Sequence, residues 1–285
     1  MTAALLPRYA RSENCLSAQA DREGKNMKKL NFTFSTKLTF DNYVHDHSIA
    51  LRCIPPETAA QHIISCELDI SPLLPTEQTR DAFGNNVTSG YLQKEHRFLD
   101  FEVRGAAETD SGKHRRDFMP CYRYQSRLTK PGEKLSAFYK ETAACISDTD
   151  TDKRAEYFSQ QVYNALSYEK NSTDIKTDAE KAFTQEKGVC QDYAHILISI
   201  LRADQIPCRY IAGLYNQSGE THAWVEYWTD GGWVGIDPTN NCYVNDNYLV
   251  LSQGRDYSDC SIDRGIMLGA YTRQMQLVSS SLTNG

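Results

Sequence analysis

The chain has 285 residues, of which 40% are hydrophobic and 24% are charged, and its formal net charge is −6. The length suits one large or two ordinary domains, and the apolar content suits a packed core, so a disordered chain is excluded. Lys and Arg are scattered and no apolar run reaches the roughly 20 residues of a membrane span, which argues against nucleic-acid and membrane partners.

The N-terminal segment MTAALLPRYARSENCL has only a short apolar stretch before its proline, too short for a secretory signal peptide. Residues 1–27 are therefore expected to be a disordered extension, and Met27 is an alternative to Met1 as the start of translation. The nine cysteines show no CxxC spacing, which indicates neither a zinc site nor a thioredoxin-like motif. Reduced thiols and a cytoplasmic location are the resulting expectation.

Apolar and polar residues alternate over residues 30–40, which predicts a half-buried strand. Similar segments, separated by turn signals, lie at 48–54, 62–70 and 96–105. We therefore predict an antiparallel β-sandwich over residues 28–125. His45 and His47 lack a convincing third metal ligand, so both are expected at a solvated strand edge.

Residues 126–285 are expected to form a second domain, after a linker broken at Pro131-Gly132. Apolar residues at helical spacing predict core-facing helices over 135–146 and 151–168, and a third helix from about Cys190 to Pro207. Strands are expected to follow at 208–215, 221–228 and 232–239.

Cys190 is expected in the first turn of the third helix, approached through the flexible Gly188. A helix N-terminus carries about half a positive charge and unpaired N–H groups, which stabilise a thiolate and can bind an oxyanion. His195 lies about 140° further around that helix and cannot share the face of Cys190, so we do not expect it to be the partner base.

Asp230-Gly231 is a strong signal for a type I′ hairpin turn. If these two residues form the loop, Trp224 lies opposite Asp237, and His222, Trp224 and Asp237 project from one face of the hairpin. Two interpretations remain open on these residues alone. One is a nucleophilic cysteine with a His–Asp pair, and the other is a buried thiol, a hydrogen-bonded histidine and an aspartate that caps a turn.

Three segments resemble the motifs of the transglutaminase-like superfamily of papain-type cysteine enzymes: GVCQDYAH at 188–195, THAWVEYW at 221–228 and GWVGIDPTNN at 232–241. GRDYSD at 254–259, and DAFGNNV and KEHRFLDFEV in the first half, resemble segments of the bacterial branch. The resemblance spans residues 30 to about 278. It implies an α+β fold in which an N-terminal β-rich domain precedes a papain-like core.

By this resemblance Cys190 is the nucleophile, His222 the base and Asp237 the residue that orients it. The implied enzyme is a cysteine-dependent amide or peptide hydrolase that acts through a thioester on a peptide or protein substrate. The alternatives are a protein-glutamine transamidase with the same thioester and a non-catalytic scaffold. The Cys190 N–H would contribute to the oxyanion hole, whose second donor the sequence does not locate. Trp224 is expected to pack in the hairpin, and no cofactor or metal is expected, since no DxDxDG calcium loop occurs. The oligomeric state does not follow from the sequence.

Overall fold

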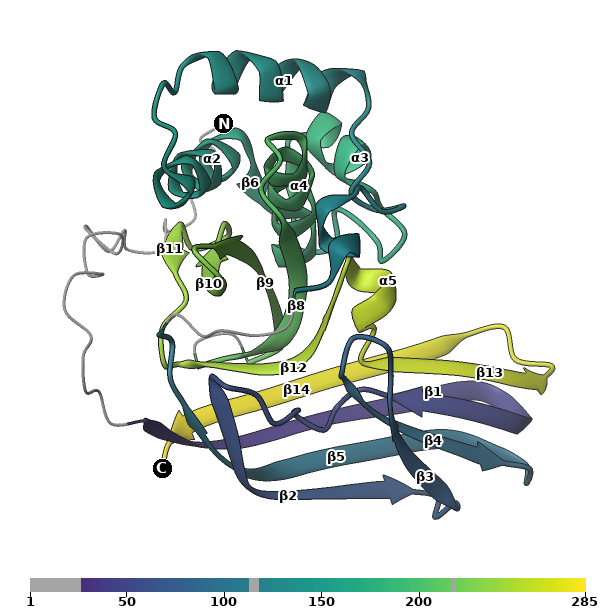
Figure 1. Cartoon of the computed structure of the whole chain (residues 1–285). Coiled ribbons are helices and arrows are strands. Elements are labelled where there is room, and N and C mark those ends of the chain that lie inside the picture. The colour runs from purple at the N-terminus through teal and green to yellow at the C-terminus, as the bar shows by residue number, and fades with distance from the viewer. Residues whose placement is uncertain (1–26, 113–117, 217–218) are drawn as a thin grey trace, which may run out of the picture.

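The computed structural model describes residues 27–112, 118–216 and 219–285, which form three layers (Figure 1). Four helices cover one side of a five-stranded sheet, and a seven-stranded sheet lies on its other side. The predicted extension falls outside the described residues, except for Met27. Within those residues, no helix combines the length and apolar character needed to cross a membrane.

The core domain contains the helices and the smaller sheet. Its helices are α1 (Glu133–Ala144), α2 (Thr151–Ala165), α3 (Ala179–Gln185), α4 (Cys190–Ala203) and the short α5 (Tyr257–Cys260), preceded by a 3-10 turn (Pro120–Arg123). The sheet has the order β11-β10-β9-β8-β12, with β8 (Cys208–Tyr215), β9 (Thr221–Thr229), β10 (Gly232–Asp237), β11 (Cys242–Tyr243) and β12 (Tyr248–Gly254). A separate parallel pair joins β6 (Ser167–Tyr168) to β7 (Lys187–Gly188).

The larger sheet is antiparallel and is organised around one long strand, β1 (Lys28–Leu51). The first half of β1 pairs with β5 and β14, and its second half pairs with β4 and β13. The other strands are β2 (Gln61–Ser71), β3 (Thr76–Arg80), β4 (Asn86–Leu92), β5 (His96–Thr109), β13 (Asp263–Gly269) and β14 (Gln274–Asn284). The sequence predicted a β-sandwich over residues 28–125, but the strands form one connected antiparallel sheet, because both groups of strands pair with β1.

The domain boundary predicted from the sequence needs one correction. Residues 126–285 were expected to belong to the catalytic domain, but β13 and β14 return to the larger sheet and pair with β1. The core is therefore inserted between the first and the last strands of that sheet. The predicted α+β fold class, with a β-rich unit followed by helices packed on an antiparallel sheet, is confirmed.

A bulge in β1 separates the two histidines that were expected together at a solvated edge. Asp46 adopts a left-handed conformation with φ of 49°, and the register of β1 against β13 shifts between His45 and Ser48. Because this breaks the strict alternation of the strand, His45 stays partly exposed beside Asp46, whereas His47 is fully buried. The prediction of a solvated edge is therefore wrong for His47.

Helix α4 is the most deeply buried element of the core, with every residue from Asp192 to Arg202 buried. Its Leu and Ile side chains belong to one cluster with the apolar residues of β8 and β9 on one side and of α2 and α3 on the other. At its C-terminal end, the buried Arg202 guanidinium donates to the carbonyls of Cys208 and Arg255 at 3.0 and 2.9 Å. These contacts fix the helix whose first residue is Cys190.

Candidate active site

Cys190 is the first residue of α4, as predicted, and Val189 is its N-cap in an extended conformation. The segment immediately before it is held in place because β7 pairs with β6. The Cys190 side chain is partly exposed. The thiol therefore lies at the positive end of a buried helix, where the free N–H groups of the first turn favour negative charge.

Asp192 holds the first turn of α4 in shape. Its carboxylate accepts hydrogen bonds from the Val189 N–H at 2.8 Å and from the Thr173 hydroxyl at 2.6 Å. Gly188 allows this arrangement, since a Cβ there would lie 2.6 Å from the Asp192 Cβ. Close approach of Asp192, rather than flexibility, explains the glycine before the cysteine.

The hairpin of β9 and β10 has the predicted turn and register. Asp230 and Gly231 have φ of 43° and 74°, as a type I′ turn requires. Pairing runs from Gly232 opposite Thr229 to Ile236 opposite Val225, which brings the next residue, Asp237, to the position facing Trp224. The strand-parity argument for a common face is confirmed.

His222 and Asp237 form a buried pair. The Nε2 atom of His222 lies 2.6 Å from Oδ2 of Asp237, and the side chains are 7% and 0% exposed. The Cys190 side chain lies close enough to the same imidazole to raise the pKa of His222. The structure therefore brings the three predicted site residues together. Trp224 is fully buried beside His222, in agreement with the expected packing role.

His222 and Asp237 each stabilise the charged form of the other. Burial by itself lowers the pKa of His222, but the Asp237 carboxylate and the Cys190 thiol outweigh it and raise that pKa to about 10. Burial likewise raises the pKa of Asp237, but His222, Asn240 and Tyr248 reverse the effect and hold it below the ordinary value. At neutral pH the site therefore contains an imidazolium between the Asp237 carboxylate and the Cys190 side chain.

Asp237 both caps a turn and contacts His222. Its Oδ1 atom accepts the N–H groups of Thr239 and Asn240 at 2.9 and 3.2 Å, which caps the turn after Pro238. Its Oδ2 atom faces His222. An aspartate before a proline is a recognised turn signal, and here the turn orients the carboxylate.

Sequence analysis missed two further partners of Asp237. The Asn240 side chain donates to Oδ2 at 2.7 Å, and the Tyr248 hydroxyl donates to the same atom at 2.9 Å. Asn240 could have been suspected from its place in the turn. Tyr248 lies on β12, which borders β8 rather than β10, so no local pattern signals its contact. The ring of Tyr215 stacks on Tyr248 at 4.4 Å.

Tyr248→Phe is expected to weaken the site without disassembling it. A buried hydrogen bond to a charged group contributes about 1.5–3 kcal/mol, and four other donors to Asp237 remain. We expect a loss of about 1–2 kcal/mol of unfolding free energy in urea and about a tenfold lower kcat/KM. Tyr124→Phe, at an exposed tyrosine outside the site, is the control. Unchanged values of both quantities would show that the hydroxyl does not support Asp237.

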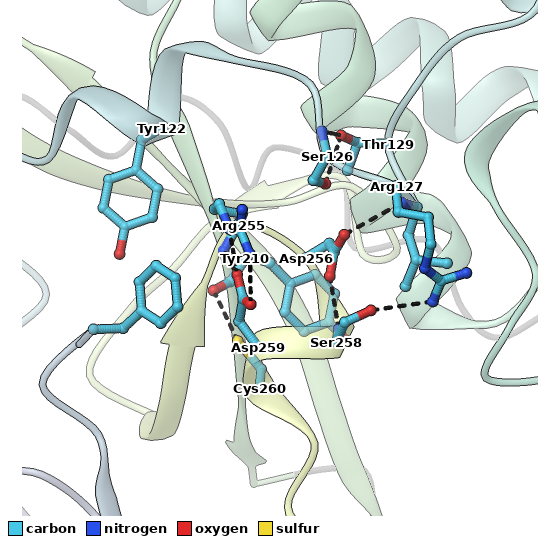
Figure 2. Close-up of polar contacts among 12 residues, drawn as sticks. Tyr122, Ser126, Arg127, Thr129, Tyr210, Arg255, Asp256, Ser258, Asp259 and Cys260 are labelled. Atoms are coloured by element: carbon cyan, nitrogen blue, oxygen red, sulfur yellow. Dashed lines mark hydrogen bonds and ion pairs between the residues drawn. The ribbon is translucent and has the colours of Figure 1, made fainter. Parts of the chain in front are cut away.

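The GRDYSD segment, which the resemblance singled out, forms a structural cluster at α5 (Figure 2). Asp256 caps α5 by accepting the Ser258 N–H at 2.7 Å, and it also accepts the Leu128 N–H at 3.2 Å. Arg127 donates to the Ser258 hydroxyl at 3.2 Å, and Arg255 pairs with Asp259 beside them. The segment thereby fastens the linker before α1 to the strand end after β12.

His195 belongs to this cluster and not to the site at Cys190. Its Nε2 atom accepts the backbone N–H of Tyr257 at 3.1 Å, and burial lowers its pKa to about 4. The imidazole is therefore neutral and its acceptor nitrogen is occupied. This agrees with the expectation that His195 is not the partner base.

Comparison with known proteins identifies the class. Residues 137–238 match the transglutaminase-like superfamily, and residues 30–108 match the bacterial transglutaminase-like N-terminal region. The chain thus contains a transglutaminase-like core and, before it, the N-terminal region of bacterial transglutaminase-like proteins.

Individual relatives agree with this assignment. An uncharacterized protein of Mycobacterium leprae is 34% identical over 123 residues, which cover 40% of this chain and 44% of that protein. A protein-glutamine gamma-glutamyltransferase of Pseudomonas aeruginosa is 39% identical over 70 residues, 20% of this chain and 10% of that protein. The match thus spans less than half the length of these curated relatives.

A solved structure from Cytophaga hutchinsonii, described provisionally as a cysteine protease, has the same fold. Its TM-score is 0.74 at 19% identity, and the match covers 90% of this chain and 91% of that one. The similarity therefore extends over both the larger sheet and the core, and it concerns the fold alone.

Proposed function

We propose that the protein is a cysteine-dependent amide hydrolase in which Cys190 is the nucleophile, His222 the acid–base residue and Asp237 the residue that orients it. The observation that carries this proposal is the buried 2.6 Å contact of His222 and Asp237, together with Cys190 at the start of α4, which raises the pKa of the same imidazole. The nucleophile Cys190 thus lies next to the base His222, which lies next to the acceptor Asp237, as covalent catalysis requires.

The proposed reaction begins with attack of the Cys190 thiolate on the carbonyl carbon of an amide. The Cys190 backbone N–H, at the start of the helix, helps to hold the oxyanion. His222 gives its proton to the leaving nitrogen, the C–N bond breaks, and a thioester and a free amine result. Water then attacks the thioester while His222 takes its proton, the C–S bond breaks, and the carboxylic acid leaves while the Cys190 thiolate and the protonated His222 are restored.

Transamidation is the second candidate, because an amine could replace water in the last step. It is favoured by the short match to a relative named as a protein-glutamine gamma-glutamyltransferase. Both reactions pass through the same Cys190 thioester, so the same residues serve both. A peptide or protein amide as substrate and a cytoplasmic location stay predictions.

The product formed in isotopically labelled water tests the proposal. The protein is incubated with a peptide library in H₂¹⁸O, with and without an added alkylamine, and products are identified by mass spectrometry. We expect hydrolysed amides that carry ¹⁸O, and none in the Cys190→Ala variant. Products that gain the amine without ¹⁸O would establish transamidation instead. No modified peptide with the wild-type protein, together with slow Cys190 alkylation, would favour the scaffold alternative.

A further inference from the structure

The strand β14 forms an open edge of the larger sheet, since its pairing partner among the described residues is β1 alone. The Ser280 N–H points away from β1 and donates to the Gly219 carbonyl of the core at 3.0 Å. Because alternate residues of an antiparallel strand bond to opposite sides, Gln274, Gln276 and Val278 also direct their N–H and C=O groups away from β1. Residues 274–278 can therefore pair with another strand.

A cavity of about 220 Å³ lies beside this edge. The strand β13 lies across from β14, since the Gln276 amide donates to the Asp263 carboxylate at 2.8 Å. Gln274 and Gln276 line the cavity and are exposed. The apolar part of the lining comes from β1, β5 and β13: Leu38, Ile49, Leu51, Leu99 and Met267. An engineered apolar cavity of about 150 Å³ in another protein holds benzene, so this one has room for a large apolar side chain.

The register of the sheet places the cavity in line with the free edge. Leu99, Leu38 and Gln276 are successive partners across β5, β1 and β14, and all three line the cavity. A strand paired with β14 would place the residue opposite Gln276 next in this row, with its side chain on the same face of the sheet. The edge thus combines main-chain hydrogen bonds with a pocket for an alternate side chain, as in known cases of strand addition.

The groups around the cavity favour an uncharged side chain. Asp263 and Arg264 are neighbours in the sequence, carry opposite charges and both line the cavity. Arg264 donates to the Ser258 carbonyl, and Asp263 accepts from the Gln276 amide. A charged occupant would be attracted by one of the pair and repelled by the other, whereas burial of an apolar side chain against the leucines is favourable. The occupant that fits is an extended peptide with a large apolar residue.

Two segments connect this edge with the candidate active site. The loop before α3 contributes Ile175 to the cavity lining, and the hydroxyl of Thr173 in the same loop donates to the first turn of α4 at 2.6 Å. On the other side, Ser280 Oγ donates to the carbonyl of Glu220 at 2.9 Å, two residues before His222. A strand added to β14 would therefore adjoin the segments that position the nucleophile and the base.

We propose that β14 binds an extended segment of the peptide substrate as an additional strand, with a large apolar side chain of that segment in the cavity. The inference rests on the proposed function in one respect, namely that the bound segment belongs to the chain whose amide reaches Cys190. It assigns the larger sheet a role in substrate recognition. The corresponding substrate class is an extended polypeptide region and not a compact protein surface.

Peptide binding to the full chain carrying Cys190→Ala tests the proposal without cleavage. The probe is a fluorescently labelled nine-residue peptide with one central leucine among threonines and serines, followed by fluorescence anisotropy. We expect saturable binding that weakens at least about tenfold when aspartate replaces the leucine. N-methylation of the leucine amide should weaken binding at least about threefold, and N-methylation of the two adjacent residues should not, because alternate residues bond to β14.

Two variants test the two parts of the surface. Met267→Trp should fill the cavity and weaken binding at least about tenfold, whereas Leu268→Trp, on the exposed opposite face of the same strand, should leave binding unchanged. Gln276→Pro should also weaken binding, because proline removes an N–H that β1 does not use. In the protein with Cys190 intact, Met267→Trp and Gln276→Pro should raise KM for peptides that contain the leucine segment and leave kcat unchanged.

The inference is wrong if binding does not saturate at millimolar peptide, if N-methylation has the same effect at every position, or if neither Met267→Trp nor Gln276→Pro weakens binding. The N-methyl series needs no change at the cavity, so it decides the matter even where a variant fails to fold. Alternating sensitivity without any cleavage by the wild-type protein would support the docking edge and contradict the proposed function. Cleavage with the same KM in all variants would support the proposed function and contradict the docking edge.

Discussion

Replacing Cys190 by alanine is expected to lower amide cleavage at least about 10³-fold, because removal of the nucleophile leaves only binding and oxyanion contacts. The fold should survive. The side chain is partly exposed, and neither the extended N-cap at Val189 nor the Asp192 contacts depend on the thiol. Steady-state rates and urea unfolding measure the two effects, and the unfolding free energy should change by less than about 1 kcal/mol.

Cys145→Ala is the matched control, since Cys145 is an exposed thiol at the end of α1. It should retain the full rate. A Cys190→Ala protein as active as the wild type would contradict the proposed chemistry, and an equal loss in both variants would indicate damage unrelated to the site.

Asp237→Asn is expected to lower kcat/KM by about 10³-fold or more. It should also lower the pH above which kcat/KM declines. In the wild-type protein the pKa of His222 is raised to about 10, so the imidazolium persists far above neutral pH. Without the carboxylate, the largest effect that opposes burial is lost, so the pKa of His222 should fall. Rate profiles and the pH dependence of iodoacetamide labelling at Cys190 should both show this shift.

The contact of His222 with Asp237 should also make the unfolding free energy depend on pH. Because folding raises the pKa of His222, its contribution is complete below pH 6.5 and disappears as the pH rises through about 10. The wild-type protein should lose unfolding free energy across that interval, and Asp237→Asn should not. Identical pH dependence in the two proteins would show that the His222–Asp237 contact carries little free energy.

The site was predictable from sequence where local rules determine it. A two-residue turn with positive φ at Asp230 and Gly231 sets the register of its hairpin, so the common side of His222 and Asp237 followed from counting. Cys190 could be placed because the apolar stripe of α4 is uninterrupted.

What escaped prediction depends on contacts between distant segments. Tyr248 reaches Asp237 from a strand that borders β8, and His47 is buried because Asp46 interrupts the alternation of β1. The short helix α3 and the pair β6 and β7 have too few residues for a periodic signal. The pairing of β13 and β14 with β1 could not be predicted from the sequence either. Alternation of apolar and polar residues indicates a strand but does not say which strand it pairs with.

The pairing of β1 with β13 and β14 also has a consequence for the order in which the protein is made. Leu30 lies opposite Asn284, so one edge of β1, the edge not paired with β5, stays open until the whole core has been synthesised. Pairing over such a separation is slow, and an open strand edge invites association with other chains. The core can fold as a unit before that closure. Newly made chains should therefore pass through a state with an assembled Cys190 region and an incomplete larger sheet.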